Sequence, residues 1–244
     1  MTLISPTEPH QTHQADETHQ ADETSEAGAL TDAAAADLLR DAPWRRFVAI
    51  GDSVVEGVRG PAPGYRDLSW FDRLTAALRS VRPDLVHRNL GRRGLLAADV
   101  RRQQLPEALH FGPDLAVVVA GGNDIFRDRF DPAAVEAELE AMVSPLRTGG
   151  SDVITMGLFD ITGADPTAPT APLLRKRIRR LAELTGAVAA RHGAVHVDFS
   201  VHPAGTDPSI YSDDRLHPNA RGHAIVAAET IRRLGEVARE RAGR

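Results

Sequence analysis

From Trp44 to the C-terminus, short apolar runs alternate with longer segments in which apolar residues recur at helical spacing. The apolar runs predict β-strands at 47–50, 86–90, 115–120, 153–158 and 194–199. The longer segments predict helices at about 68–80, 95–109, 131–147, 172–192 and 219–242. Five strands alternating with five helices favour an α/β fold, in which helices cover both faces of a five-stranded parallel sheet.

The N-terminal residues 1–43 differ in composition from the rest of the chain. They carry nine acidic side chains and one basic side chain, whereas residues 44–244 carry 25 acidic and 28 basic side chains. Residues 12–17 recur as 18–23, and this polar repeat has too little apolar area to offset the entropy lost on ordering. We expect 1–43 to be an acidic, largely disordered tail with a short helix near 31–41, and 44–244 to be one folded domain.

Composition also disfavours several classes of function. The sequence has no cysteine, which removes thiolate metal sites and cysteine nucleophiles. It has neither a His and Glu cluster at metal-ligand spacing nor a glycine-rich nucleotide-binding fingerprint, so we expect no metal and no cofactor. The arginines are scattered along the expected helices, and no basic run contains aromatic residues, so we expect no nucleic-acid partner.

The N-terminal residues lack the basic and apolar regions of a signal peptide. No window of the sequence approaches the roughly 18 apolar residues that a membrane span requires. We therefore expect a cytoplasmic protein without a membrane span. The sequence gives no indication of an oligomeric state.

The first expected strand leads into a candidate nucleophile. Gly51 ends the apolar run 47–50 and is followed by Asp52 and Ser53. A serine on a strand-to-helix turn exposes its hydroxyl beside free backbone amides, where an acyl group could be attacked and its oxyanion stabilised. The same three residues could equally form an ordinary turn and helix cap.

Three further polar blocks follow later strands. Asn89 to Gly94 follows the second strand, Gly121 to Asp124 follows the third, and Asp214 to His217 follows the fifth. Because parallel strands end at the same edge of a sheet, we expect all four blocks to meet at one edge. This convergence favours a catalytic site more strongly than any single block does.

The residue types suggest roles within that site. Ser53 needs a base to act as a nucleophile, and His217 is the preferred base because imidazole titrates near neutral pH. Asp214 lies three residues before His217 and could accept a hydrogen bond from its other ring nitrogen. Asp213 is the nearest competitor for that role. We interpret His223 as a packed or capping residue.

The four blocks resemble those of the SGNH branch of the GDSL-type hydrolases, over roughly residues 45–235. Ser53 matches the serine block, Gly94 the glycine block, Asn123 the asparagine block, and Asp214 with His217 the final block. Val54 departs from the leucine that the family name implies. The resemblance implies a three-layer, flavodoxin-like sandwich with strand order 2-1-3-4-5. It also implies metal-independent hydrolysis of esters or thioesters through an acyl-enzyme.

The resemblance further implies an oxyanion hole formed by the backbone amides of Ser53 and Gly94 and the side-chain amide of Asn123. Two alternatives remain open. Gly91 could take the place of Gly94, and Asn123 could brace the loop after the third strand. We expect Asp124 to brace that loop and to take no part in catalysis.

The sequence therefore predicts a serine esterase that acts on a small-molecule substrate, an ester with a small to medium acyl group, through Ser53, His217 and Asp214. One alternative is an acyltransferase that uses the same triad. The other is a carbohydrate- or lipid-binding module that kept the fold without the chemistry. Aromatic side chains that could line the acyl pocket are Tyr65, Phe126, Phe130, Phe159 and Tyr211.

Overall fold

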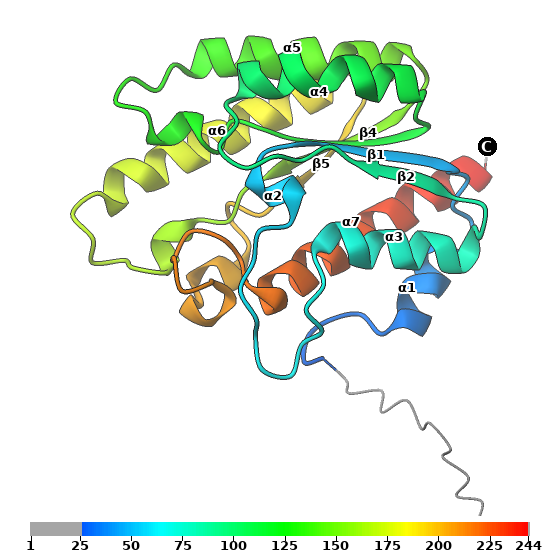
Figure 1. Ribbon diagram of the computed structural model, residues 1–244, viewed down its shortest axis with the longest axis horizontal. Helices are drawn as coiled ribbons and strands as arrows, with labels where there is room; N and C mark the ends of the chain where they lie inside the picture. Colours follow the sequence, from blue (N-terminus) through cyan, green and yellow to red (C-terminus); the bar gives the residue numbers. More distant parts are fainter. Residues whose placement is uncertain (1–25, 244) are drawn as a thin grey trace, which may run out of the picture.

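A five-stranded parallel sheet in the order β2-β1-β3-β4-β5 forms the centre of the protein (Figure 1). The computed structural model describes residues 26–243. The strands are β1 (Arg46–Gly51), β2 (Val86–Asn89), β3 (Leu115–Val119), β4 (Asp152–Gly157) and β5 (Val195–Asp198). The α/β class, the five strands and the order 2-1-3-4-5 are thus confirmed.

Several helices begin at residues whose side chains accept hydrogen bonds from free backbone amides. Ser69 and Asp72 form a reciprocal capping box at the start of α3, Asp131 caps α5 ahead of Pro132, and Asn219 caps α7. The helices are α1 (Asp32–Leu39), α2 (Ser53–Glu56), α3 (Trp70–Val81), α4 (Ala97–Phe111), α5 (Pro132–Thr148), α6 (Ala171–Arg191) and α7 (Ala220–Ala242).

Side chains of the sheet alternate between two cores. Phe47 and Ala49 of β1 pack in one core with residues of α1, α3 and α7, whereas Val48 and Ile50 pack in the other with residues of α4, α5 and α6. These two groups of helices lie on opposite faces of the sheet (Figure 1). Every residue of β3 is buried, as expected for the central strand of a sheet that is covered on both sides. The two helical layers hold the sheet rigidly beneath the loops that emerge at its carboxyl edge.

The folded body begins before Trp44. Glu26 is 7% exposed, and its carboxylate accepts hydrogen bonds from both terminal nitrogens of Arg73, at 2.6 and 2.8 Å. Burial acts to raise the pKa of Glu26, but the hydrogen bonds and charges of Arg73 and Arg66 hold it below its ordinary value. Within the described residues, the boundary expected at 43/44 therefore does not separate a loose tail from the domain.

Helix α1 lies in the range 31–41 where a short helix was expected, and Thr31 caps it. It packs against α3 and α7. The acidic repeat at 12–23, for which disorder was expected, lies outside the described residues.

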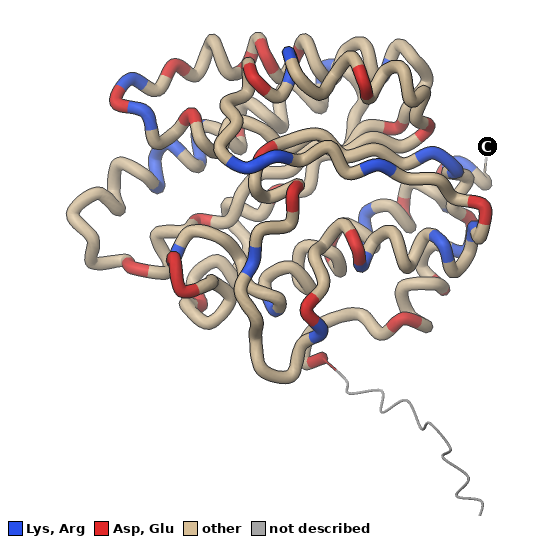
Figure 2. The backbone as a smooth tube through the Cα atoms, in the orientation of Figure 1, with Lys and Arg blue, Asp and Glu red and all other residues tan. Residues whose placement is uncertain are grey.

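Charges are interspersed along the chain (Figure 2). Several pair one turn apart on a helix, as Arg180 does with Glu183 and Arg233 with Glu236. Exposed pairs of this kind each contribute at most about 1 kcal/mol. Over residues 26–243, no helix has the length and apolar character to cross a membrane.

Candidate active site

Ser53 is the first residue of α2 and lies directly beyond the end of β1. The turn depends on Gly51, where a Cβ atom would lie 2.2 Å from the Val119 carbonyl oxygen. The buried amide of Gln104 holds the same turn, since its Oε1 accepts the Gly51 N–H at 2.7 Å and its Nε2 donates to the Gly51 carbonyl at 2.9 Å. The Ser53 side chain is therefore fixed by the central sheet and not by a surface loop.

Ser53, His217 and Asp214 form one chain of hydrogen bonds. The distance from His217 Nε2 to Ser53 Oγ is 2.8 Å, and that from His217 Nδ1 to Asp214 Oδ2 is 2.7 Å. The other carboxylate oxygen of Asp214 accepts the backbone amides of Leu216 and His217, at 2.9 and 3.0 Å. Asp213, the competing acid, is exposed and has no such bond to His217.

The charge of Asp214 and the hydrogen bonds around it favour one tautomer of His217. Partial burial acts to raise the pKa of Asp214, but the hydrogen bonds from the His217 ring and from two backbone amides lower it below its ordinary value. An ionised Asp214 can only accept, so His217 Nδ1 must donate and Nε2 is left to accept from the Ser53 hydroxyl. This is the arrangement in which an imidazole can remove a proton from serine.

The two candidate glycines differ in what surrounds their amides. The Gly91 amide donates to Asn89 Oδ1 at 2.9 Å, and a Cβ atom at Gly91 would lie 2.2 Å from the Glu56 nitrogen. Gly91 thus serves close packing against α2. Gly94 has a left-handed φ of 79°, and within residues 26–243 neither its amide nor that of Ser53 donates a hydrogen bond.

Asn123 both lines the pocket and braces a loop. Its side-chain nitrogen donates to the Leu95 carbonyl at 2.9 Å, which uses one of its two N–H groups. Asp124 supports the same junction, because its carboxylate accepts the Ala97 amide at the start of α4, at 2.9 Å. Together the two residues tie the loop after β3 to the loop that carries Gly94.

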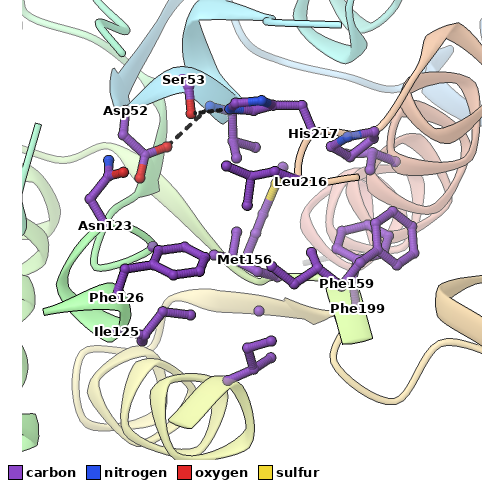
Figure 3. Close-up of a pocket in the computed structure, with 18 residues that line it drawn as sticks. Asp52, Ser53, Asn123, Ile125, Phe126, Met156, Phe159, Phe199, Leu216 and His217 are labelled. Atoms are coloured by element: carbon purple, nitrogen blue, oxygen red, sulfur yellow. Dashed lines mark hydrogen bonds between the residues drawn. The ribbon is translucent and has the colours of Figure 1, made fainter. Parts of the chain in front are cut away.

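Asp52, directly before Ser53, is a buried carboxyl whose environment the sequence did not reveal. It is 2% exposed and lines the pocket, and its Oδ1 accepts the Val54 amide at 3.1 Å. Burial raises its pKa to about 6, against the opposing effects of that hydrogen bond and of the nearby His217. In Figure 3 the side chains of Asp52 and Asn123 point toward one another.

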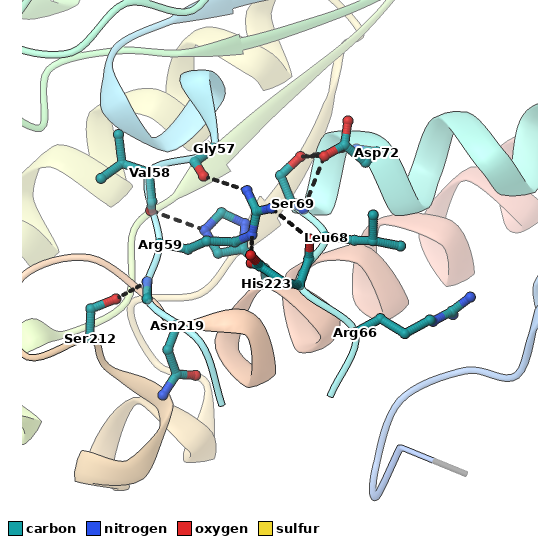
Figure 4. A network of polar contacts seen from close by, with 12 residues as sticks. Gly57, Val58, Arg59, Arg66, Leu68, Ser69, Asp72, Ser212, Asn219 and His223 are labelled. Carbon is teal, nitrogen blue, oxygen red and sulfur yellow. Dashed lines mark hydrogen bonds and ion pairs between the residues drawn. The ribbon is translucent and has the colours of Figure 1, made fainter. Parts of the chain in front are cut away.

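His223 supports the segment that follows Ser53, in agreement with its interpretation as a packed or capping residue (Figure 4). Its Nδ1 accepts the Trp70 amide at the start of α3 at 3.0 Å, and its Nε2 contacts the Val58 carbonyl at 3.3 Å. The Val58 amide in turn donates to the Ser53 carbonyl at 3.0 Å. Burial lowers the pKa of His223 to about 4, so the ring is neutral at pH 7.

A pocket of about 70 Å³ opens beside Ser53 and His217 and extends toward Ile125, Phe159 and Phe199 (Figure 3). Of the five aromatic residues expected to line it, Phe126 and Phe159 do so. The other three lie elsewhere: Tyr65 donates to the Ala27 carbonyl, Phe130 packs under Arg177, and Tyr211 donates to the Gly205 carbonyl. In the described residues, no group of three or more His, Asp or Glu side chains is arranged to hold a metal ion.

Comparisons with known proteins agree with this architecture. The chain is 24% identical over 208 residues to an acetylxylan esterase from Geobacillus stearothermophilus. The aligned region covers 78% of this chain and 94% of that protein. A crystal structure of a catalytic mutant of an acetylxylan esterase from the same organism superposes with a TM-score of 0.65 at 21% identity, over 78% of this chain and 94% of that one. The α/β hydrolase LAE5, from the metagenome of Lake Arreo, has a TM-score of 0.64 at 24% identity, over 78% and 95%.

The model of the GDSL-like lipase/acylhydrolase family matches residues 49–225, from the second half of β1 to the first turns of α7. The match begins within the strand that leads to Ser53 and extends past His217. The chain therefore belongs to the GDSL-like lipase/acylhydrolase family and is a hydrolase of ester bonds.

Proposed function

We propose that this protein is a serine esterase in which Ser53 is the nucleophile, His217 the general base and Asp214 the residue that orients His217. The observation that carries the proposal is the unbroken chain of hydrogen bonds from Asp214 through His217 to Ser53, at the mouth of an apolar pocket. The substrate is a carboxylic ester or thioester with a small to medium acyl group.

In the first half of the reaction, His217 Nε2 takes the Ser53 proton while Ser53 Oγ bonds to the carbonyl carbon of the ester. The negative charge on the carbonyl oxygen is stabilised by the amides of Ser53 and Gly94 and by the second N–H of Asn123. One such donor typically lowers the barrier by about 2.7–4 kcal/mol. The bond to the alcohol oxygen then breaks, and His217 returns the proton to the leaving alcohol.

In the second half, a water molecule takes the place of the alcohol. His217 removes one proton from the water as its oxygen bonds to the acyl carbon, and the same proton then returns to Ser53 Oγ as the acid leaves. If another alcohol replaced water in this step, the enzyme would be an acyltransferase. Addition of a competing alcohol distinguishes the two, since a transferase would form new ester faster than free acid.

The test compares Ser53→Ala and His217→Ala with the wild type on 4-nitrophenyl butanoate. We expect each substitution to lower kcat at least about 10³-fold, because neither the nucleophile nor its base can be replaced by water at the same position. Matched controls are Ser80→Ala and His110→Ala, which remove exposed side chains at the C-terminal ends of α3 and α4. These helix ends lead into the amino ends of β2 and β3, whereas the site lies at the carboxyl edge of the sheet. Wild-type activity in either site variant, with circular dichroism unchanged, would refute the proposed roles.

The acetylxylan esterase relative makes acetylated carbohydrate one candidate substrate class. The cytoplasmic location expected from the sequence stays a prediction, which fractionation of cells that express the native gene would test.

A further inference from the structure

The pocket beside Ser53 is lined by residues that follow β3, by the end of β4 and the segment after it, by the residue that follows β5, and by one residue each of α6 and α7. Its inner wall consists of apolar side chains that are each at most 5% exposed. These are Ile125, Met156, Phe159, Ile178, Phe199 and Val226. The inner part of the pocket is therefore an extension of the hydrophobic core, and the sheet holds it open.

The polar side chains that line this pocket gather around Ser53 (Figure 3). Among the described lining residues, these are Asp52, Ser53, Asn123 and His217. A hydroxyl or charged group placed further inside would lose its water and find no side-chain partner, which is costly. The inner pocket thus suits a saturated hydrocarbon and disfavours a sugar or any other polar group.

The acyl side of the ester suits this enclosed space better than the alcohol side does. The acyl group becomes bonded to Ser53 in the first half-reaction and leaves only at the end of the second, whereas the alcohol must leave in between and be replaced by water. His217, which protonates the alcohol, lies on the loop with the half-exposed Asp214, so this side of Ser53 is open to solvent. A group that remains bound can occupy the closed side without blocking turnover.

The volume of the pocket limits the length of the acyl chain that it can hold. An apolar protein cavity of about 150 Å³ accommodates benzene, which has six carbon atoms. By that measure, a pocket of about 70 Å³ holds about three carbon atoms beyond the ester carbonyl. On the basis of the proposed esterase function, we propose that this pocket selects straight acyl chains of about four carbons, so that butanoyl esters are preferred to acetyl esters.

The size of the preference follows from the hydrophobic effect. Each methylene that moves from water into an apolar site contributes about fourfold to kcat/KM. Two additional methylenes therefore favour butanoyl over acetyl by about 15-fold. Hexanoyl and octanoyl chains exceed the pocket and must displace its walls, so kcat/KM should fall again beyond butanoyl.

Ile178 offers a direct test of the wall. It is 1% exposed and lies on α6, and its truncation in Ile178→Ala removes about as many carbon atoms as the pocket holds. The optimum should then move to hexanoyl or longer. Leu184→Ala is the matched control, because Leu184 is also buried on α6 in the same core but does not line the pocket.

The first experiment measures kcat/KM for 4-nitrophenyl acetate, butanoate, hexanoate and octanoate. A second pair, methyl butanoate and propyl acetate, are isomers, so their comparison separates the acyl side from the alcohol side at equal carbon number. We expect a maximum at butanoate, a shift to longer chains only in Ile178→Ala, and faster hydrolysis of methyl butanoate than of propyl acetate.

The ester series distinguishes an error in the acyl-pocket assignment from an error in the proposed esterase function. Ser53-dependent hydrolysis that is fastest for acetate, or that favours propyl acetate, would overturn the acyl-pocket assignment and leave the esterase intact. Absence of Ser53-dependent hydrolysis with every ester would overturn both. If Ile178→Ala does not fold, the wild-type chain series and the isomer pair still decide the matter.

Discussion

Replacement of Asp52 by Asn should make the protein more stable at neutral pH. Asp52 is buried beside Ser53, and desolvation raises the pKa of its carboxyl from the ordinary 3.8 to about 6. Asn is isosteric and can still accept the Val54 amide, so the cap of α2 is retained. The substitution therefore removes the buried charge and little else.

The sign and size follow from proton linkage. Because the pKa of Asp52 is higher in the folded state, its favourable contribution is complete below about pH 3.8 and is lost as the pH rises through about 6. The side-chain amide introduced by Asp52→Asn does not titrate. A shift of about two units corresponds to about 3 kcal/mol, so the stability of Asp52→Asn relative to wild type should rise by most of that amount between pH 4 and pH 7.

The difference between variant and wild type is the quantity to measure. The pKa of His223 is lowered to about 4 by burial, so its contribution has the opposite sign: it is present above about pH 6.5 and is lost as the pH falls through about 4. The two effects partly cancel in the wild-type profile but not in the difference, since both proteins contain His223. Urea unfolding at pH 4, 5, 6 and 7 provides the free energies of unfolding.

Asp198→Asn is a suitable control. Its carboxylate also accepts an amide two residues ahead, that of Ser200 at 2.8 Å, but its side chain is exposed. The same urea titrations of Asp198→Asn measure how the loss of an exposed carboxylate that accepts an amide changes the free energy of unfolding. A flat difference for Asp52→Asn over this range would refute the assignment of a costly buried charge.

Two further outcomes are expected. Asp214→Asn should lower kcat on 4-nitrophenyl butanoate by about 10³–10⁴-fold, because an amide can hold His217 in the wrong tautomer. The control Asp213→Asn should change kcat little. Equal rates for the two variants would contradict the proposal that Asp214 orients His217. Glu26→Ala should lower the free energy of unfolding by about 3–5 kcal/mol, because it leaves the buried Arg73 without its carboxylate. Glu183→Ala, which removes one partner of an exposed pair, should cost less than about 1 kcal/mol in the same urea titration. A loss for Glu26→Ala no larger than that for Glu183→Ala would show that the pair of Glu26 and Arg73 is not buried in solution.

Strands and helices could be predicted from the sequence because each has its own period. The run at 115–120 has no polar residue, as a central strand requires, and it forms β3 with every residue buried. The segment at 131–147 begins with Asp131 and Pro132, which form the start of α5. The strand order came from family resemblance, because periodicity alone does not fix which strands are neighbours.

The meeting of residues from the segments that follow the strands could also be predicted, because topology brings these segments to one edge of the sheet. Ser53, Asn123, Asp214 and His217 all lie there. The inner wall of the pocket was not predictable: Met156 and Ile178 have the same apolar character as any core residue, and only coordinates show that they face a cavity. The burial of Asp52 was missed for a different reason: a carboxyl that follows a glycine is typical of exposed turns.

The buried position of Glu26 in the segment 26–43 was missed because the acidic composition of that segment indicates exposure. The segment is acidic like the residues before it, but Glu26 is compensated by Arg73, a residue 47 positions further along the chain. A pairing over that separation leaves no local pattern in the sequence.

The most direct test of the account is the site of covalent labelling by a fluorophosphonate, which reacts with activated serines. We expect one adduct per chain, located by mass spectrometry on Ser53, with labelling strongly slowed in His217→Ala and unchanged in the control His110→Ala. Hydrolysis of 4-nitrophenyl butanoate that continues at the wild-type rate after Ser53 has been fully labelled, or inactivation by a label on another residue, would contradict the role of Ser53 as the nucleophile.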